Sequence, residues 1–431
     1  MRPLLHATAL ACALAVLPGG AARGQFIRPG SGLQEEETRT VVTLLQDSEE
    51  SLWRLGPFRV TPVLGLQDLR YDSTAASPTS DQEGDVTATF AAGFDAYLPL
   101  GSKSVFSFSA VPAYTYWVEF SEQNRFVGSY GASLLGDFNR ARISFAAGQR
   151  EDLEIVSPEL LQRPPQERQD FRAELEIDLA RSLALYIEAG EQRTRLDEPE
   201  PGFDPGLDTL RRLDRDETRV RAGLLFHSDE RFELGIGLQR EVNDFSTADR
   251  ANEGDSPYLT LRLEGNRLEA SIDLAQRSLE PRDGSAFQTV DDVTGTYRLT
   301  LSPGWRISYS VYGGRYILYS LSEEQSHLED ERMGLGLGIE LSPRASLELW
   351  GEEGELRYNT LPGALPVPNE DISAWGGSLA VQVSDRSRLS LRGGHVEFDS
   401  PLPGADREWN FFMTGFSITL SRVRIDVGTG G

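Results

Sequence analysis

Apolar and polar residues alternate one by one over whole segments of this chain, and this period of two limits the fold more than any other feature. Residues 171–179 show it without exception: Phe171, Ala173, Leu175, Ile177 and Leu179 alternate with Arg172, Glu174, Glu176 and Asp178. Successive side chains of a β-strand point to opposite faces, whereas a helix would mix the two sets around its axis. The segment therefore predicts a strand with one apolar face and one charged face.

The same pattern returns from about Gly56 onward, for example in residues 86–98, 232–239 and 333–341. Tight turns such as 100–102 and 302–304 separate some segments, and longer polar linkers such as 156–168 and 195–214 separate the others. Short turns alternating with long loops are typical of up-and-down hairpins in bacterial outer-membrane barrels, where the short turns face the periplasm. The spacing predicts about 18 strands.

The chain after residue 24 contains no stretch of about 20 apolar residues, the length that a membrane helix needs. A closed barrel is the other structure that pairs every backbone group inside lipid. We therefore expect an all-β fold, an up-and-down antiparallel transmembrane β-barrel in the cell outer membrane of a Gram-negative bacterium.

Aromatic residues cluster near the ends of the predicted strands. Amphipathic rings favour the headgroup level of a membrane. We expect interfacial girdles to include Phe106, Tyr114, Tyr116, Trp305, Tyr309, Tyr319, Trp375, Trp409, Phe411 and Phe412.

The N-terminal region predicts three parts. Residues 1–24 have the basic start, the short apolar core and the small residues of a secretory signal peptide, and they contain the only cysteine, Cys12. Residues 25–55 form a periplasmic leader or a short helix that plugs the barrel, because Val41 and Leu44 belong to a roughly helical apolar pattern. The barrel itself occupies residues 56–427.

The charge balance argues against nucleic acid as a partner. The chain has 42 Lys+Arg against 67 Asp+Glu, and its formal net charge is -25. A polyphosphate backbone would be repelled rather than bound.

Charged residues recur on the predicted polar face of the strands. Ions buried in a dry core would each cost several kcal/mol unless paired, so a wetted, ion-paired lumen is expected. The predicted lumen-facing selectivity residues are Arg172, Glu174, Glu176, Asp178, Arg219, Arg221, Glu233, Arg262, Glu264, Arg298, Arg306 and Glu348.

The sequence offers no catalytic group, metal site or cofactor motif. His227, His327 and His395 are each isolated, without the spacing of metal ligands. The nearest imitation of a hydrolase pair is Ser326 beside His327. The acidic loops match no calcium-loop pattern, and solvated loop charge is their default interpretation.

Two short segments resemble a known family. Residues 58–66, followed by Tyr71 and Asp72, are similar to the first strand of the porin-2 type outer-membrane β-barrels, some of which are associated with exopolysaccharide or exosortase loci. Residues 114–116, with Glu119 and Asn124 after them, are also similar to this family. The resemblance covers residues 54–427 and implies export or permeation across the outer membrane, without catalytic residues.

These observations predict a porin or an export channel for small solutes or polysaccharide, with the charged lumen as its selectivity element. Two alternatives stay open: a plugged structural or scaffold barrel whose acidic surface loops bind partners, and a barrel hydrolase. The expected partners are outer-membrane lipid, the outer-membrane assembly machinery and the transported solute or polysaccharide.

Overall fold

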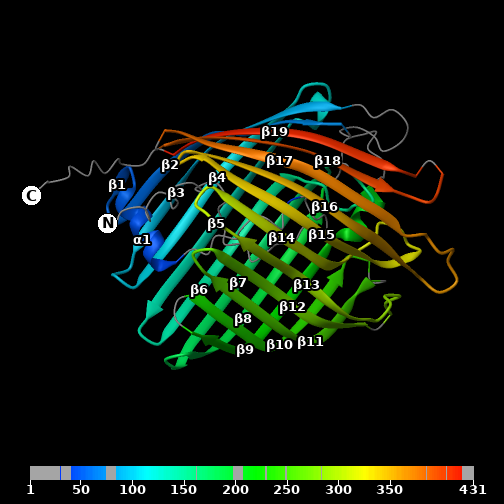
Figure 1. Ribbon diagram of the computed structural model, residues 1–431, viewed down its shortest axis with the longest axis horizontal. Helices are drawn as coiled ribbons and strands as arrows, with labels where there is room; N and C mark the ends of the chain where they lie inside the picture. Colours follow the sequence, from blue (N-terminus) through cyan, green and yellow to red (C-terminus); the bar gives the residue numbers. More distant parts are fainter. Residues whose placement is uncertain are drawn as a thin grey trace, which may run out of the picture.

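Strands dominate the computed structural model and form one antiparallel sheet that closes on itself (Figure 1). The structure describes residues 30, 40–73, 84–161, 163–197, 207–228, 231–247, 250–282, 284–384, 386–403 and 405–419. Within these residues, 18 strands close a barrel, because each strand from β2 to β19 pairs with the next and β19 pairs with β2. The predicted all-β, up-and-down antiparallel barrel is confirmed.

The first half of the barrel consists of β2 (Phe58–Asp72), β3 (Asp85–Pro99), β4 (Ser104–Trp117), β5 (Arg125–Phe138), β6 (Ala141–Leu153), β7 (Pro165–Ala180), β8 (Leu183–Leu196), β9 (Arg215–His227) and β10 (Phe232–Phe245). The second half consists of β11 (Asn252–Glu264), β12 (Leu268–Pro281), β13 (Val290–Leu301), β14 (Ile307–Leu318), β15 (Gln325–Ser342), β16 (Ala345–Thr360), β17 (Glu370–Ser384), β18 (Ser387–Asp399) and β19 (Arg407–Thr419).

Among the described residues, few other elements lie outside the barrel strands. They are α1 (Val41–Glu50), the short β1 (Trp53–Leu55), η2 (Ser121–Gln123), α2 (Leu207–Leu210) and η3 (Arg211–Leu213). No helix in the described part of the chain is long and apolar enough to cross a membrane. The predicted signal peptide, residues 1–24, and the last predicted barrel residues, 420–427, lie outside the described residues.

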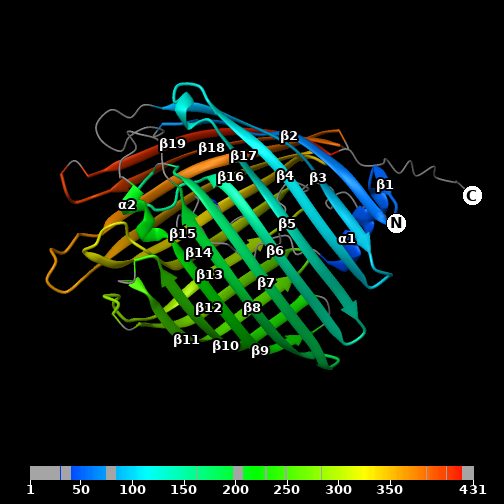
Figure 2. The ribbon, with the colours of Figure 1, turned by 180° about the vertical axis from the view of Figure 1, so that it is seen from behind.

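The two ends of the barrel differ. At one end short turns join successive strands, such as β5 to β6, and at the other end longer loops join them, such as residues 154–164 between β6 and β7. The strands run obliquely between the two ends (Figure 2). We name the short-turn end periplasmic and the long-loop end extracellular, following the rule for bacterial barrels.

The outer face of the wall is apolar, as the alternation predicts. Phe171 and Leu179 on β7 are exposed, as are Met333 and Leu335 on β15. In a membrane barrel these outward side chains contact lipid.

Three aromatic residues lie on the other face, so their assignment to the interfacial girdles is wrong. Tyr319, Trp409 and Phe411 are buried among residues inside the barrel. Trp305, Trp375 and other members of the predicted set are exposed. Period two fixes which residues share a face, but it does not say which face meets lipid.

Candidate functional site: the lumen of the barrel

The predicted lumen residues lie on strands β7, β9, β10, β11, β13 and β16, with the exception of Arg306. In each strand they alternate with outward apolar residues such as Phe171, Val220 and Ile236, so they face the lumen. Arg306 lies in the turn before β14, where its guanidinium carbon is 4.1 Å from the centre of the Trp305 ring. The role of these residues as selectivity elements stays a prediction.

Ion pairs join neighbouring strands along this inner wall. The Arg172 Nε atom lies 2.5 Å from Glu174 Oε1 and 3.2 Å from Glu188 Oε1 of β8. His227, at the end of β9, has its Nε2 atom 3.3 Å from Glu176 Oε1 and its Nδ1 atom 3.5 Å from Glu233 Oε2. The structure thus brings charges of both signs together on a wall that is only half-buried at this height.

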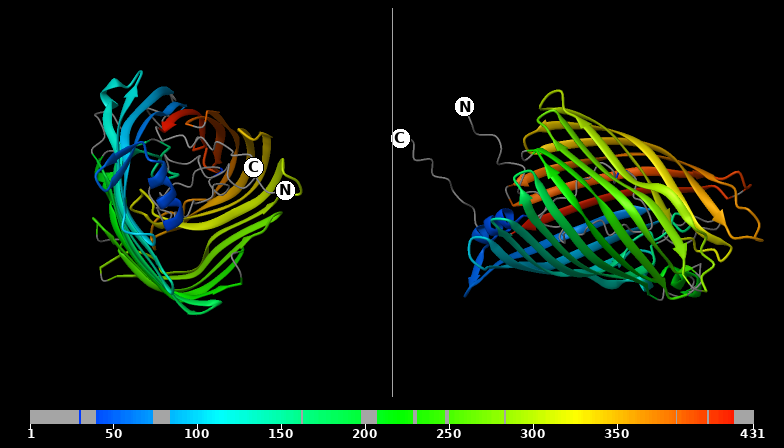
Figure 3. Two further views of the ribbon diagram at one scale, coloured as in Figure 1. Left: turned by 90° about the vertical axis from the view of Figure 1, so that its left-hand side faces the viewer. Right: turned by 90° about the horizontal axis from the view of Figure 1, so that it is seen from below.

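Helix α1 lies inside the ring of strands at the periplasmic end (Figure 3, left). It begins at Thr40, whose side chain accepts a hydrogen bond from the Thr43 backbone N–H. Val41 and Leu44 pack in a cluster with wall residues of β3, β4 and β5. The segment 25–55, expected to be a leader or a short helix, therefore contains a helix docked in the periplasmic mouth.

The loop between β6 and β7, residues 154–164, turns into the barrel with its described residues 154–161, 163 and 164, and we call it the inward loop. Ile155, Val156, Leu160 and Leu161 are almost fully buried, although they belong to a loop at the barrel mouth. A tight turn forms its tip, where the Leu160 backbone N–H donates to the Ser157 carbonyl oxygen at 3.1 Å. Burial of so much apolar surface fixes the loop inside the lumen.

One side of the inward loop packs on an apolar part of the inner wall. Ile155 and Leu161 belong to one cluster with aromatic residues of β16, β18 and β19, including Trp350, Phe398 and Trp409. The Trp409 ring stacks on Phe411 with 4.5 Å between their centres. This part of the wall is therefore largely apolar, with charged groups at its border, since the Arg407 guanidinium carbon is 5.1 Å from the centre of the Phe398 ring and Trp409 Nε1 donates to Asp72 Oδ1 at 3.1 Å.

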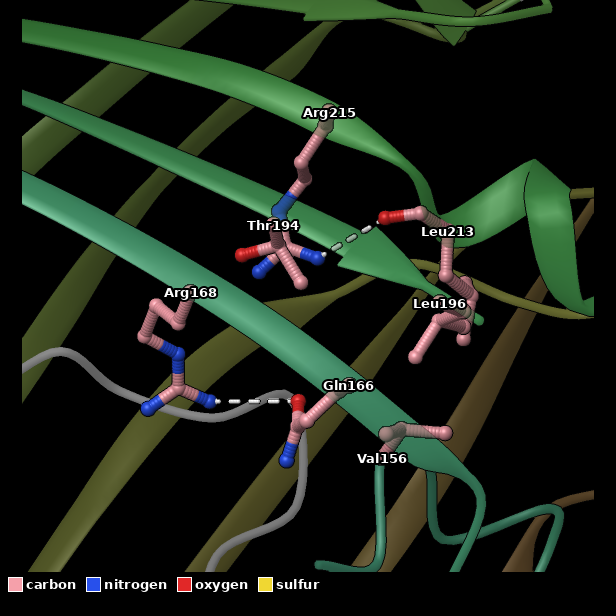
Figure 4. Close-up of a pocket in the computed structure, with 7 residues that line it drawn as sticks. All are labelled: Val156, Gln166, Arg168, Thr194, Leu196, Leu213 and Arg215. Atoms are coloured by element: carbon pink, nitrogen blue, oxygen red, sulfur yellow. Dashed lines mark hydrogen bonds between the residues drawn. The ribbon is translucent and has the colours of Figure 1, made fainter. Parts of the chain in front are cut away.

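The other side of the inward loop packs on the ends of several strands and on the connections between them. Val156 and Leu160 lie in a second cluster with Leu213, Phe245 and Tyr319, among others. A cavity of about 10 Å³, room for about one water molecule, remains at the base of the loop between β7, β8 and β9 (Figure 4). Val156 of the loop thus forms part of the lining of this cavity, together with residues at the ends of these strands.

Polar contacts join the inward loop to two further parts of the wall. The Glu159 carboxylate accepts hydrogen bonds from Ser320 Oγ at 2.7 Å and from the Leu321 backbone N–H at 2.6 Å. Arg163 Nη2 lies 2.9 Å from Asp72 Oδ2 of β2, and the Arg163 guanidinium carbon is 4.9 Å from the centre of the Trp117 ring of β4. The loop therefore contacts both the tip between β14 and β15 and the wall at β2 and β4, which are not adjacent in the strand order.

Burial along the inner wall changes from one end of the barrel to the other. On β15, Asp330 and Arg332 are buried near the extracellular end, whereas Glu340 is exposed near the periplasmic end. The lumen is therefore a chamber that is filled at its extracellular end and open to solvent toward the periplasmic end.

The Ser326–His327 pair lies within β15 rather than in a loop. Ser326 Oγ is 3.1 Å from His327 Nδ1, and His327 Nε2 is 3.7 Å from Glu329 Oε1. Ser326 and His327 are both buried, and Ser326 Oγ accepts the backbone N–H of Gln288 at 2.7 Å. This buried arrangement gives a substrate no access and fits a structural role.

No group of three or more His, Cys, Asp or Glu side chains that could hold a metal ion occurs among the residues that the structure describes. The inward loop, Trp350 and the Trp409–Phe411 pair are the features that the sequence interpretation missed. Their signal was an apolar pattern inside a predicted loop and aromatic residues of opposite parity on one strand.

Known proteins match this chain in fold. No protein-family model matches, and no curated protein matches. Among solved structures, OccAB3 from Acinetobacter baumannii is 10% identical and has a TM-score of 0.52, with 84% of this chain and 99% of that chain covered. OccK2 (OpdF) from Pseudomonas aeruginosa is 12% identical with a TM-score of 0.52, covering 84% and 98%. OccK9 (OpdG) from Pseudomonas aeruginosa is 12% identical with a TM-score of 0.50 at the same coverage.

Identities this low speak for the fold alone. The class is a closed antiparallel β-barrel of 18 strands with an apolar outer face, the fold of outer-membrane porins. This fold locates the chain in the outer membrane, because lipid-embedded sheets must close to pair all their strand edges.

Proposed function

We propose that this protein is a channel of the porin type that lets small charged or polar solutes cross the outer membrane through the lumen. The observation that carries this proposal is the half-buried, ion-paired inner wall around Arg172, Glu174 and Glu188, below the inward loop. A wall of this kind is stable only in contact with water, and an 18-stranded barrel is wide enough to hold water.

The filled extracellular end favours small solutes over a polymer. A polysaccharide chain would need a wide path, whereas Ile155, Leu160 and Leu161 occupy this part of the lumen. We therefore favour passage of small solutes over export of polysaccharide as the function of the lumen. The apolar outer face supports outer-membrane lipid and the barrel assembly machinery as partners.

The same filled end favours one second candidate, a plugged barrel that conducts nothing and serves as a scaffold for its acidic surface loops. In that case the inward loop and α1 would be permanent parts of the core. The two candidates differ in what happens when the inward loop is removed.

The test is conductance in planar bilayers of the purified mature chain and of a short-turn variant. Leu153 and Pro165 are register partners, so an Asn-Gly turn can replace residues 154–164 without displacing β6 or β7. We expect brief openings of the wild type and steady current through the short-turn variant. Shortening the exposed loop around Leu365 is the matched control, with no change expected. A folded short-turn barrel without current would overturn the channel.

A further inference from the structure

The pairing between β13 and β14 stops halfway up the wall. The register runs from Leu301 opposite Tyr309 to Gly295 opposite Arg315 and ends there. Both strands continue beyond this point, because β13 still pairs with β12 as far as Val290 and β14 still pairs with β15 as far as Leu318. Backbone pairing between the two strands therefore ends at Gly295, and beyond it an ion pair still joins them, with Arg315 Nη2 of β14 2.5 Å from Asp292 Oδ2 of β13.

Glycine is required where the strands part. Gly295 has φ of 140°, and a Cβ atom there would lie 1.9 Å from the Asp273 carbonyl oxygen. A backbone of this kind is available to glycine and disfavoured for other residues. The glycine at this position therefore permits the backbone conformation at which pairing between β13 and β14 ends, and we call this position the branch point.

Above the branch point, the tip of the β14–β15 hairpin, residues 319–324, is held by loops from distant strands. Arg250, between β10 and β11, donates to the carbonyl oxygens of Ser320 and Ser322. Arg212, between β8 and β9, donates to the Leu321 carbonyl oxygen at 3.0 Å. The inward loop adds the hydrogen bonds to Glu159 described above.

A third segment, residues 284–289 after β12, lies against the ends of β15 and β16. The Gln288 backbone N–H donates to Ser326 Oγ at 2.7 Å, and its side-chain amide donates to the Thr360 carbonyl oxygen at 2.7 Å. Phe287 is buried and lies near both Tyr319 and His327. Hydrogen bonds that each involve one side chain, rather than backbone-to-backbone pairing, connect residues 284–289 to β15 and β16.

We propose that the inward loop and the β14–β15 tip together form a lid over the lumen. The lid opens when the tip separates from the inward loop and the upper part of β14 completes its backbone pairing with β13. This inference rests on the proposed function, since a lid has meaning only for a channel. The closed state has the apolar and arginine contacts of the lid, and the open state has the restored ladder. One hairpin thus has two alternative sets of partners, which is the requirement for a two-state switch.

The test locks the seam between the two strands. In the continued register Thr294 would face Tyr316, and opposed residues have Cα atoms about 4.5–5.5 Å apart, within the range of a disulfide. The only cysteine of the chain, Cys12, lies in the predicted signal peptide, so the pair T294C/Y316C is unambiguous. The matched control is T300C/S310C, two opposed residues of the paired part of the seam.

We expect both pairs to cross-link on oxidation, measured by gel mobility after cleavage between them. Oxidised T294C/Y316C should raise the open fraction in planar bilayers at least about tenfold, and a reductant should reverse this. Oxidised T300C/S310C and the single variants T294C and Y316C should show no redox-dependent change.

Two results would overturn the lid. One is formation of the T300C/S310C cross-link without the T294C/Y316C cross-link, which means that the strands do not meet above Gly295. The other is a cross-linked seam with wild-type current while the short-turn variant conducts. Absence of current from the short-turn variant as well would overturn the proposed channel itself.

Discussion

The Glu159 carboxylate accepts the backbone N–H of Leu321 at 2.6 Å, although 162 residues separate the two in the chain. Glu159 belongs to the inward loop between β6 and β7, and Leu321 belongs to the tip between β14 and β15. Their contact joins two loops whose strands are not neighbours in the barrel. Closure of the extracellular end is therefore a property of loop packing and not of the barrel wall.

This contact makes the lid sensitive to pH. Burial raises the pKa of the Glu159 carboxyl above its ordinary value, while hydrogen bonds from Leu321 and Ser320 and the charges of Arg250 and Arg407 act in the opposite direction. The closed state therefore binds the proton more tightly than an open state in which Glu159 is solvated. Falling pH, through the raised pKa, should favour closure, and the open fraction should decrease.

Bilayer recordings between neutral and acidic pH check this sign. Glu159→Gln removes the titrating group, while its amide oxygen can still accept from the Leu321 N–H and its amide nitrogen can donate to Ser320 Oγ, so its open fraction should lose the decrease on acidification. An unchanged pH profile in Glu159→Gln, or a wild-type current that rises on acidification, would contradict the assignment.

Leu160→Ala should open the channel by weakening the lid. Leu160 is 2% exposed, and truncation of a buried leucine costs about 2–5 kcal/mol. If that cost falls on the closed state, the ratio of open to closed rises roughly 30-fold or more, since about 1.4 kcal/mol is a factor of ten. Leu365→Ala, at an exposed loop position, is the control in the same recordings, and equal currents from both variants would count against the lid.

Helix α1 should limit current at the periplasmic mouth. Leu44 is fully buried against the wall, whereas Val42 on the same helix is 71% exposed. Leu44→Asp places a charge in the apolar contact and should undock the helix, which raises single-channel conductance. Val42→Asp adds the same charge without touching the contact, so a similar increase in both variants would show a charge effect and not undocking.

The acidic part of the inner wall should favour cations. Glu174 and Glu188 both neighbour Arg172, so removal of both carboxylates leaves the guanidinium without these counter-charges. The double variant E174Q/E188Q should move the reversal potential in a salt gradient toward anions. Asp255→Asn, an exposed position near the end of β11, should leave it unchanged.

The barrel could be predicted because its information is local. In β7 the alternation that begins with Phe171 and Arg172 predicts which residues lie on each face of the strand, and the short turns predict which strands form hairpins. The alternation of faces along a strand also shows why assigning both Phe411 and Phe412 of β19 to the lipid girdle was wrong. Phe411 and Phe412 are adjacent, so they face opposite sides of the sheet and cannot both belong to a lipid girdle. Phe411 faces inward and Phe412 is 51% exposed.

The inward loop could not be predicted from the same patterns. Its partners, such as Trp350 and Ser320, lie far away in the chain, and no periodicity records such contacts. The available signal was composition: Ile155, Leu160 and Leu161 are apolar residues in a loop that should face water. Burial among distant residues removes that conflict.

In a channel closed by this lid, water fills the lumen and only the lid separates this water from the exterior. Thiol labelling tests it directly with Ser144→Cys, a half-buried inner-wall position of β6, and Phe145→Cys, its 44% exposed outward neighbour, as control. A membrane-impermeant maleimide should label Ser144→Cys quickly from the periplasmic side, slowly from outside, and quickly from both sides once the short turn replaces residues 154–164. Equal rates from both sides in the intact chain would contradict the lid, and no labelling at Ser144→Cys in either form would contradict the water-filled lumen.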